Sequence, residues 1–314
     1  MQYGPEVKAV AVHLSTYQML PVKRTAELID DLFGLPISEA TVISSLNEAS
    51  ELVQPTVDAI GDAILKSKVV NADETGMRVA GGLHWIHLLT TPLLTWMACH
   101  AKRGKEAFDG LGILPFFLGI LVHDGWKPYR ELNCLHALCN VHHLRELVYL
   151  FEQCQQAWAG DMIQLLTLAC HEVNEAFKVG VLLTPERCAY LRGRYSEILA
   201  EGEALNPLQP SSGKRGKAKQ SKATNLLIRL RTFEEDIWRF AYDPDVPFTN
   251  NLAEQPVRMP KVKQKVSGCF RTEIGAATFC TIRSYLATLH KQGCNPLQAL
   301  IQTFKGHPPQ PRFA

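Results

Sequence analysis

KVVNADETG (residues 68–76) and LGILVHDGW (residues 118–126) are the two stretches that most clearly indicate the fold class. Each is a short apolar run that ends in an aspartate, Asp73 in the first and Asp124 in the second. Short apolar runs bounded by turn residues are typical of buried strands. Further strands are predicted at residues 84–89, 93–100 and 135–139, and a helix at residues 102–111. Strands followed by alternation of strand and helix predict an α/β domain.

The regions on either side of these strands have the periodicity of helices. Residues 5–66 predict a helix over Thr25–Phe33, a turn at Gly34–Pro36 and a second helix that Ser38 caps and that extends through Ala49. This is the spacing of a helix-turn-helix, but the second helix carries no Arg or Lys that could contact DNA, so a plain helical hairpin is the preferred interpretation. Residues 141–248 predict an all-helical insertion, interrupted by a basic loop at residues 206–224.

Length and composition limit the number of domains and the class of protein. A chain of 314 residues suggests about two domains. Its 33 Lys and Arg residues nearly balance 31 Asp and Glu residues, which excludes a strongly basic protein of the histone type. Nine cysteines without a CxxC pair favour a reducing, intracellular compartment over a disulfide framework. Residues 79–101 lack charges, but the glycines, histidines and Pro92 among them favour two buried strands over a membrane span.

Three acidic residues could form a metal site. Asp73 and Asp124 follow apolar strands, and Glu254 stands near the start of a predicted helix. Carboxylates that converge repel one another unless divalent cations neutralise them, and oxygen ligands select Mg²⁺ or Mn²⁺. Each acid alone also fits a structural role: Asp73 in a turn before Gly76, Asp124 in the turn at the following glycine, and Glu254 in a capping box with Asn251.

The sequence resembles the transposases of the insertion sequence 66 family, which belong to the DDE group. The densest match is the long block that contains Glu254, in which two asparagines precede Ala-Glu and basic residues follow. The resemblance is carried by YGPEVKAVAVHLSTYQMLPVKRTAELIDDLFGLPIS (residues 3–38), ADETG (72–76), HDGWKPY (123–129), CNVHHLREL (139–147), FTNNLAEQPVRMPKVKQKVSGCFRTEIGA (248–276) and IRSYLATLHKQG (282–293).

This resemblance implies an RNase H-like mixed sheet with Asp73, Asp124 and Glu254 as the catalytic triad on two Mg²⁺ ions, or Mn²⁺. It implies hydrolysis at transposon ends, then attack of the freed 3′-hydroxyl on target DNA. Double-stranded DNA is the implied partner of a homo-oligomer, together with accessory proteins of the element and without a membrane. A cytoplasmic, nucleoid-associated bacterial protein is expected. The alternatives are a non-catalytic DNA-binding remnant and a structure-selective nuclease of the same fold.

The predicted layout follows from this resemblance. Family members usually begin with a coiled coil and a zinc-finger-like segment, and this sequence starts after both, so we expect a truncated copy or one product of a split reading frame. The predicted parts are an N-terminal helical region (1–66), the first part of the RNase H-like core (67–140), the helical insertion (141–248), the second part of the core (249–292), and a C-terminal helix and tail (293–314).

A Cys–His cluster and a basic segment lie close to the predicted triad. Cys134, His136, Cys139 and His142 are too closely spaced for an ordinary zinc site with two half-sites, so no zinc is expected. A buried Cys139 beside a helix-start histidine is the first interpretation. The resemblance suggests another, in which His142 contacts a phosphate or a flipped base. Phosphate contact is also expected of the basic segment after the triad glutamate, namely Arg258, Lys261, Lys263, Lys265 and Arg271.

The helix that carries Glu254 contains Pro256 and Pro260. Proline lacks the N–H that a helix interior needs, and it also restricts the residue before it. The sequence therefore predicts a short, kinked or irregular helix between Gln255 and Lys261.

Overall fold

The computed structural model describes residues 3–210 and 218–313. The chain divides into two compact units. The first, here called the sheet unit, comprises Met1–Leu121, Lys127–Cys134 and Asn251–Ala314, and the second, the helical unit, comprises Val122–Trp126 and Leu135–Asn250. Within the described residues, no helix has the length and apolar character needed to cross a membrane.

A mixed five-stranded sheet gives the chain its α/β character, as the sequence predicts. The spatial order is β3-β2-β1-β4-β5, and β1 pairs antiparallel with β2, which pairs antiparallel with β3. This arrangement, with helices around the sheet, is consistent with an RNase H-like fold. The strands are β1 (Val69–Val79), β2 (Gly82–Thr90), β3 (Thr95–His100), β4 (Ile120–His123) and β5 (Leu135–Leu138).

The hairpin of β1 and β2 corrects one prediction. The sequence predicts a strand that ends at Asp73, because Glu, Thr and Gly follow it, yet β1 continues to Val79. Asp73 lies opposite Leu88, and the register remains regular up to the turn. Ala80 and Gly81 both have positive φ, 48° and 81°, which is the geometry that joins two strands in a two-residue turn. The backbone pairing outweighs the weak strand propensity of the polar side chains.

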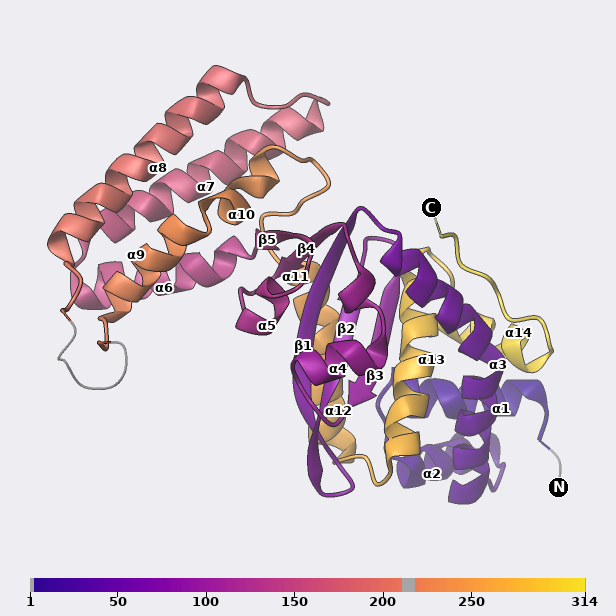
Figure 1. The fold of residues 1–314 in the computed structure, drawn as a ribbon. Coiled ribbons are helices and arrows are strands. Elements are labelled where there is room, and N and C mark those ends of the chain that lie inside the picture. The colour runs from indigo at the N-terminus through magenta and orange to yellow at the C-terminus, as the bar shows by residue number, and fades with distance from the viewer. Residues whose placement is uncertain (1–2, 211–217, 314) are drawn as a thin grey trace. The chain divides into compact units, whose positions relative to one another are not determined.

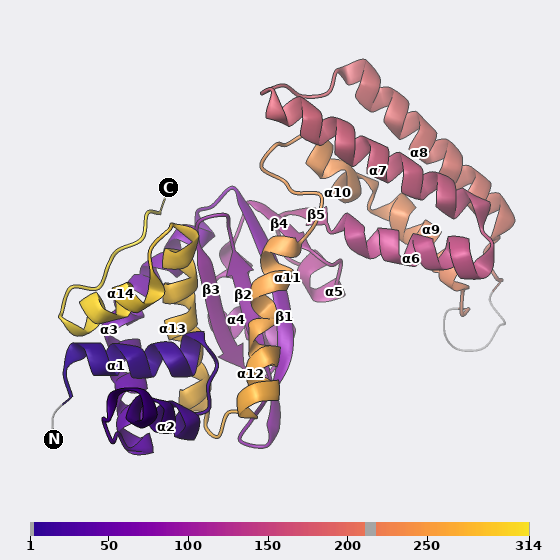
Figure 2. The ribbon, with the colours of Figure 1, turned by 180° about the vertical axis from the view of Figure 1, so that it is seen from behind.

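The two faces of this hairpin are covered by different helices. Side chains of β1, β2 and β3 form one buried cluster with α11 (Asn251–Val257) and α13 (Glu273–Lys291). Figure 2 shows these two helices and α12 (Met259–Ser267) in front of the strands. The other face carries α4 (Lys105–Leu111) and α5 (Lys127–Arg130), where Phe108 and Tyr129 stack with ring centroids 5.2 Å apart.

The helices at the start of the chain pack against those at its end. The helices α1 (Pro5–Val12), α2 (Val22–Phe33) and α3 (Glu39–Leu65) come first, and α14 (Pro296–Phe304) comes last. Figure 1 shows α1 and α3 beside α13 and α14, and all four share a buried cluster. Ser38 caps α3 as predicted, but the predicted end at Ala49 is wrong. The helix continues past an exposed Pro55 because Val53, Val57 and further apolar residues extend its buried face.

Side chains of α13 also accept hydrogen bonds from backbone N–H groups of β3, which is an edge strand of the sheet. The hydroxyl of Thr288 accepts the N–H of Thr95 at 2.9 Å, and the hydroxyl of Ser284 accepts the N–H of Met97 at 2.8 Å. Both hydroxyls are buried. An edge strand whose N–H groups are bonded in this way cannot offer them to another chain.

The helical unit consists of helices that follow one another along the chain, as the periodicity predicts. The helices are α6 (Asn140–Cys154), α7 (Ala157–Lys178), α8 (Pro185–Leu205), α9 (Lys222–Thr232) and α10 (Glu234–Trp238). Trp158, Tyr195 and Trp238 are its largest buried side chains. The basic loop predicted at 206–224 ends earlier than expected, because Ser221 caps α9, and residues 211–217 lie outside the described part of the chain.

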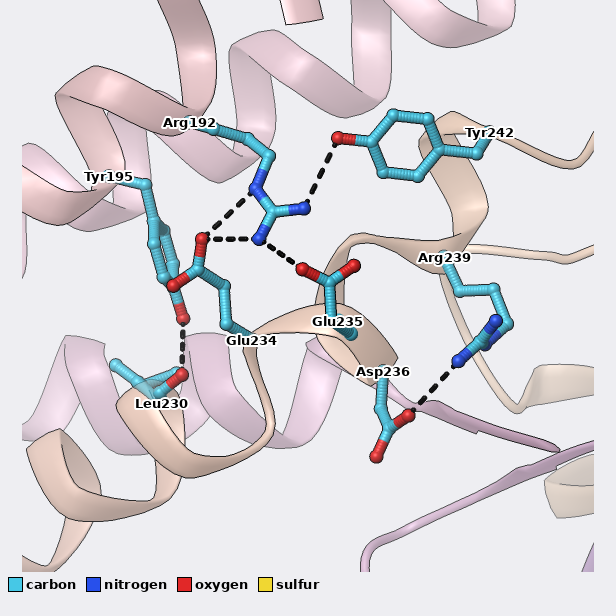
Figure 3. Close-up of polar contacts among 8 residues, drawn as sticks. All are labelled: Arg192, Tyr195, Leu230, Glu234, Glu235, Asp236, Arg239 and Tyr242. Atoms are coloured by element: carbon cyan, nitrogen blue, oxygen red, sulfur yellow. Dashed lines mark hydrogen bonds and ion pairs between the residues drawn. The ribbon is translucent and has the colours of Figure 1, made fainter. Parts of the chain in front are cut away.

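Ion pairs centred on Arg192 join α8 to the segment that begins with α10 (Figure 3). The Arg192 guanidinium donates to Glu234 at 2.6 and 3.0 Å, to Glu235 at 2.5 Å and to the Tyr242 hydroxyl at 3.4 Å. The hydrogen bond from Arg192 lowers the pKa of Glu235. Nearby, the Tyr195 hydroxyl donates to the carbonyl of Leu230 at 3.0 Å. These carboxylates are used to hold helices together.

Candidate active site

Asp73 lies in the middle of β1 and is half-buried. Its Oδ1 accepts the backbone N–H of Glu74 at 2.8 Å. Because side chains alternate along a strand, Asp73 faces the same side as Met77 and Val79. Those two side chains belong to the cluster that includes α11 and α13, so Asp73 is on the face that these helices cover.

Glu254 reaches the same face from the first turn of α11. Its neighbours Ala253 and Val257 pack into the cluster on β1 and β2, and Glu254 itself is buried, with 8% of its surface exposed. The exposed Arg258 contacts its carboxylate at 3.6 Å. The fold therefore brings the Glu254 helix onto the sheet face that carries Asp73, although the two residues are far apart in the sequence.

Asp124 is the first residue after β4, as the sequence predicts. It is exposed, and its Oδ1 accepts the N–H of Trp126 at 2.8 Å. The N–H of Gly125, whose φ is +87°, bonds to Nδ1 of His123 at 3.0 Å. The two amides that follow Asp124 are thus both bound by side chains of the same turn.

The three acids offer the donor chemistry that Mg²⁺ and Mn²⁺ prefer, which is carboxylate oxygen. Asp73 is half-buried and Glu254 is buried, so a bound cation would offset part of the cost of removing each carboxylate from water. These residues therefore suit divalent cations by donor type and burial. It stays a prediction that Asp73 and Glu254 share metal ions with Asp124.

The helix around Glu254 is interrupted, as its prolines predict. Helix α11 ends at Val257 and α12 begins at Met259. The N–H of Arg258 bonds to the carbonyl of Gln255, three residues back, at 3.2 Å, which is tighter than the α-helical pattern. The break falls between Gln255 and Lys261, where the sequence predicts it.

The predicted phosphate-binding residues differ in their surroundings. Lys265 and Arg271 are exposed. Lys261 is exposed too, and its ammonium donates to the carbonyl of Gly76 on β1. Lys263 is half-buried with its ammonium 5.2 Å from the centroid of the Phe270 ring, and burial lowers its pKa. The exposed members present charge to solvent, whereas Lys263 also packs against an aromatic ring. His142, the remaining candidate, is half-buried on α6.

Glu74 is a buried acid next to Asp73 whose role sequence reasoning missed. Its side chain is only 2% exposed and points to the face opposite Asp73, where Arg103 donates to it at 2.6 and 2.8 Å and the Tyr129 hydroxyl donates as well. The Arg103 guanidinium also lies 4.7 Å from the Trp85 ring. In the sequence, Asp73 and Glu74 are simply adjacent acids. They were assigned to opposite faces of the sheet only once β1 was seen to continue past Asp73 and to pair with β2 over both residues.

The residues of the Cys–His cluster in the helical unit have structural contacts. Cys139 is buried at the N-cap of α6, and its Sγ accepts the backbone N–H of Asn250 at 3.1 Å. The following Asn140 donates to the carbonyl of Ile237 at 3.0 Å. These contacts favour the interpretation of Cys139 as a buried residue at a strand end. The expectation of no zinc stays a prediction.

A mixed sheet with one acid on its central strand and another on a helix packed over the same face defines the class: an α/β protein with an RNase H-like fold and a candidate carboxylate site. The chain belongs to the Transposase IS66 family, whose model matches residues 1–278. No curated protein matches the sequence. The matched region includes all three acids and ends within α13. Membership of this DDE family confirms the resemblance seen in the sequence and implies a transposase role, DNA as partner and the use of divalent metal.

Proposed function

We propose that this chain is a DNA transposase that hydrolyses phosphodiester bonds at transposon ends and then joins the freed 3′-hydroxyl to target DNA. The supporting observation is that Asp73 and the helix of Glu254 lie on one face of the sheet, in a chain of a DDE transposase family. Asp124 completes the proposed triad.

In this proposal Asp73, Asp124 and Glu254 would hold two divalent ions, which would supply Lewis-acid stabilisation of the charge that develops on the reacting oxygens. Water attacks the phosphorus of the scissile bond, the P–O3′ bond breaks, and the 3′ oxygen leaves with a proton. The 3′-hydroxyl then attacks a target phosphorus, the bond from that phosphorus to a target 3′ oxygen breaks, and the proton lost by the attacking hydroxyl is balanced by the proton that the leaving 3′ oxygen takes up. Each step exchanges one P–O bond for another, so no external energy source is required.

The exposed basic residues hold the DNA backbone in this proposal. Lys265 and Arg271 contact phosphates, and Arg258 exchanges its contact with Glu254 for a phosphate when DNA and metal enter. Such contacts are independent of base sequence and weaken as salt concentration rises. His142 contributes a phosphate or base contact. The protein acts as a homo-oligomer on double-stranded DNA with accessory proteins of its element, in the bacterial cytoplasm on the nucleoid.

Metal-dependent nicking of a supercoiled plasmid that carries the DNA flanking the gene tests this function. Wild type should nick with Mg²⁺ or Mn²⁺ and not with EDTA, and D124N should lose nicking while binding DNA at least as well, because it removes repulsion of phosphate. The exposed Asp109 on α4 provides a matched control, D109N, which should behave as wild type. Wild-type nicking by D124N would overturn the mechanism, and DNA binding without any nicking would favour a non-catalytic remnant.

A further inference from the structure

We infer that His123 is a positioning residue for Asp124. The inference rests on the proposed function, because it assigns to a buried histidine the task of fixing a carboxylate proposed to bind metal. All residues that carry the argument lie in the helical unit, in Val122–Trp126 and Leu135–Asn250.

The imidazole of His123 is completely buried at the end of β4, and each of its ring nitrogens makes a directional contact. Its Nδ1 accepts the N–H of Gly125 at 3.0 Å, so Nδ1 carries no proton. The proton therefore resides on Nε2, which faces Nδ1 of His136 on β5 at 3.2 Å and donates to it. The contacts thus assign one tautomer to a neutral His123.

His136 is itself held in place. The Nε of Arg239 donates to its backbone carbonyl at 2.6 Å, and Arg239 also pairs with Asp236 at 3.3 Å. The ring of His123 is therefore a bridge: one nitrogen is fixed to the paired strand β5, and the other holds the turn after β4.

This bridge sets the direction of the Asp124 carboxylate. Gly125 has φ of +87°, a region that side-chain-bearing residues rarely adopt, and its N–H is the one that His123 holds. The next amide, that of Trp126, donates to Asp124 Oδ1 at 2.8 Å. With the first amide fixed by His123, the second is oriented toward the carboxylate, which keeps Asp124 in one rotamer. Groups behind a metal ligand commonly tune metal affinity in this way.

Two replacements separate this role from simple packing. In H123N the amide oxygen can occupy the place of Nδ1 and still accept from Gly125, but the link to His136 is lost. In H123Q the longer side chain can reach the place of Nε2 and His136, but the acceptor for Gly125 is lost. Glutamine fills more of the buried volume than asparagine, so a packing role predicts that H123Q is the better tolerated. The positioning role predicts the opposite order.

The experiment measures Mn²⁺ binding to the full chain without DNA, by electron paramagnetic resonance of free Mn²⁺, and the Mn²⁺ dependence of plasmid nicking. H123Q should bind Mn²⁺ about tenfold more weakly than wild type and need correspondingly more Mn²⁺ for half-maximal nicking. H123N should fall between the two. The melting temperatures of both variants show how much each loses in stability.

Equal Mn²⁺ affinity in wild type and H123Q would overturn the inference, as would a weaker affinity in H123N than in H123Q. Failure of the proposed function gives a different result: wild type itself would not nick, or D124N would bind Mn²⁺ as wild type does. An effect of H123Q that appears only in melting temperature assigns His123 to packing and also overturns the inference.

Discussion

The sheet unit is closed by contacts between residues far apart in the sequence, whereas the helical unit is built mainly from helices that follow one another. In the sheet unit, the N–H of Thr95 meets Thr288 across 193 positions, and that of Met97 meets Ser284 across 187. In the helical unit, α6 packs on α7, α7 on α8 and α8 on α9. The sheet unit therefore depends on long-range contacts, apolar as well as polar, that no local segment can replace.

Acids that pair with arginines and acids proposed for chemistry have different surroundings. Glutamates of the helical unit pair with arginines on neighbouring helices, as Glu234 does with Arg192 at 2.6 Å and Glu172 with Arg187 at 2.6 Å. In the sheet unit, Asp73 accepts a main-chain N–H and Glu254 has a contact of 3.6 Å with an exposed arginine. The sheet unit contains a short arginine pair too, between Glu74 and Arg103 at 2.6 Å, and this acid is distinct from those proposed for chemistry.

The largest change in stability is expected where hydroxyls of α13 accept hydrogen bonds from backbone N–H groups of β3. S284A combined with T288V removes the acceptors of two buried N–H groups, each worth about 1–3 kcal/mol when left unsatisfied, so we expect a loss of about 4 kcal/mol in urea denaturation. Hydrogen exchange at the amides of Thr95 and Met97 should speed up before that of the rest of β3. T281V, which removes a more exposed hydrogen bond to Gln54, serves as the control on the same helix. A loss no greater than that of the control would show that water replaces the hydroxyls.

Acid should weaken the sheet unit through His87. Burial lowers the pKa of this histidine from 6.5 to about 4, and its ring contacts the carbonyl of Lys102 at 3.2 Å. The unfolded chain therefore takes up a proton below pH 6.5 that the folded chain does not, so stability falls as pH drops from 6.5 to about 4, by about 3 kcal/mol in all. H87Q keeps a donor for Lys102 and cannot titrate, so its unfolding free energy should change less over this window. Parallel pH profiles for wild type and H87Q would refute this assignment.

A smaller effect is expected in the helical unit from R192M, which removes the contacts to Glu234 and Glu235. The arginine is partly exposed, so screening limits the loss to about 1 kcal/mol, and high salt should reduce it further. Thermal unfolding of wild type and R192M at low and high salt measures the loss of stability and its dependence on salt. R194M removes an exposed pair with Glu197 on the same helix and should change little. If R194M destabilised the protein as much as R192M, the cluster would have no special role.

These differences explain what the sequence could predict. Caps are local, and Ser38, Thr272 and Asn295 each accept a backbone N–H at the start of a helix; the sequence predicts the cap at Ser38. The break after Glu254 is local too, since it follows from Pro256 and Pro260. Strand-end Asp124 and the helical periodicity of the helical unit were equally accessible.

What escaped prediction depends on partners distant in the sequence. The extension of β1 beyond Asp73 is decided by pairing with β2, and the extension of α3 beyond Ala49 by packing against α13. The role of Glu74 required both the phase of β1 and the arrival of Arg103 and Tyr129 from other elements. The triad itself was reached through family resemblance, because its spacing alone has little specificity.

The smallest change in stability is expected from P256A, although it tests the geometry of the proposed active site most directly. Pro256 lies inside α11 and cannot donate to the carbonyl of Leu252, and the N–H of Arg258 has shifted to a bond with Gln255. Alanine would restore one helical hydrogen bond, but it would also give the unfolded chain more freedom, and Pro260 would still interrupt the helix. We therefore expect the free energy of unfolding to rise by less than about 1 kcal/mol.

The effect of P256A on activity should be larger than its effect on stability. A straighter α11 would rotate Arg258 away from Glu254 and alter the approach of Lys261 to Gly76, so plasmid nicking should fall while Mn²⁺ binding changes less. P260A, which leaves the proline nearest Glu254 in place, is the matched comparison and should affect nicking less than P256A. Nicking by P256A at the wild-type rate would show that the bend after Glu254 is tolerated by the site rather than required by it.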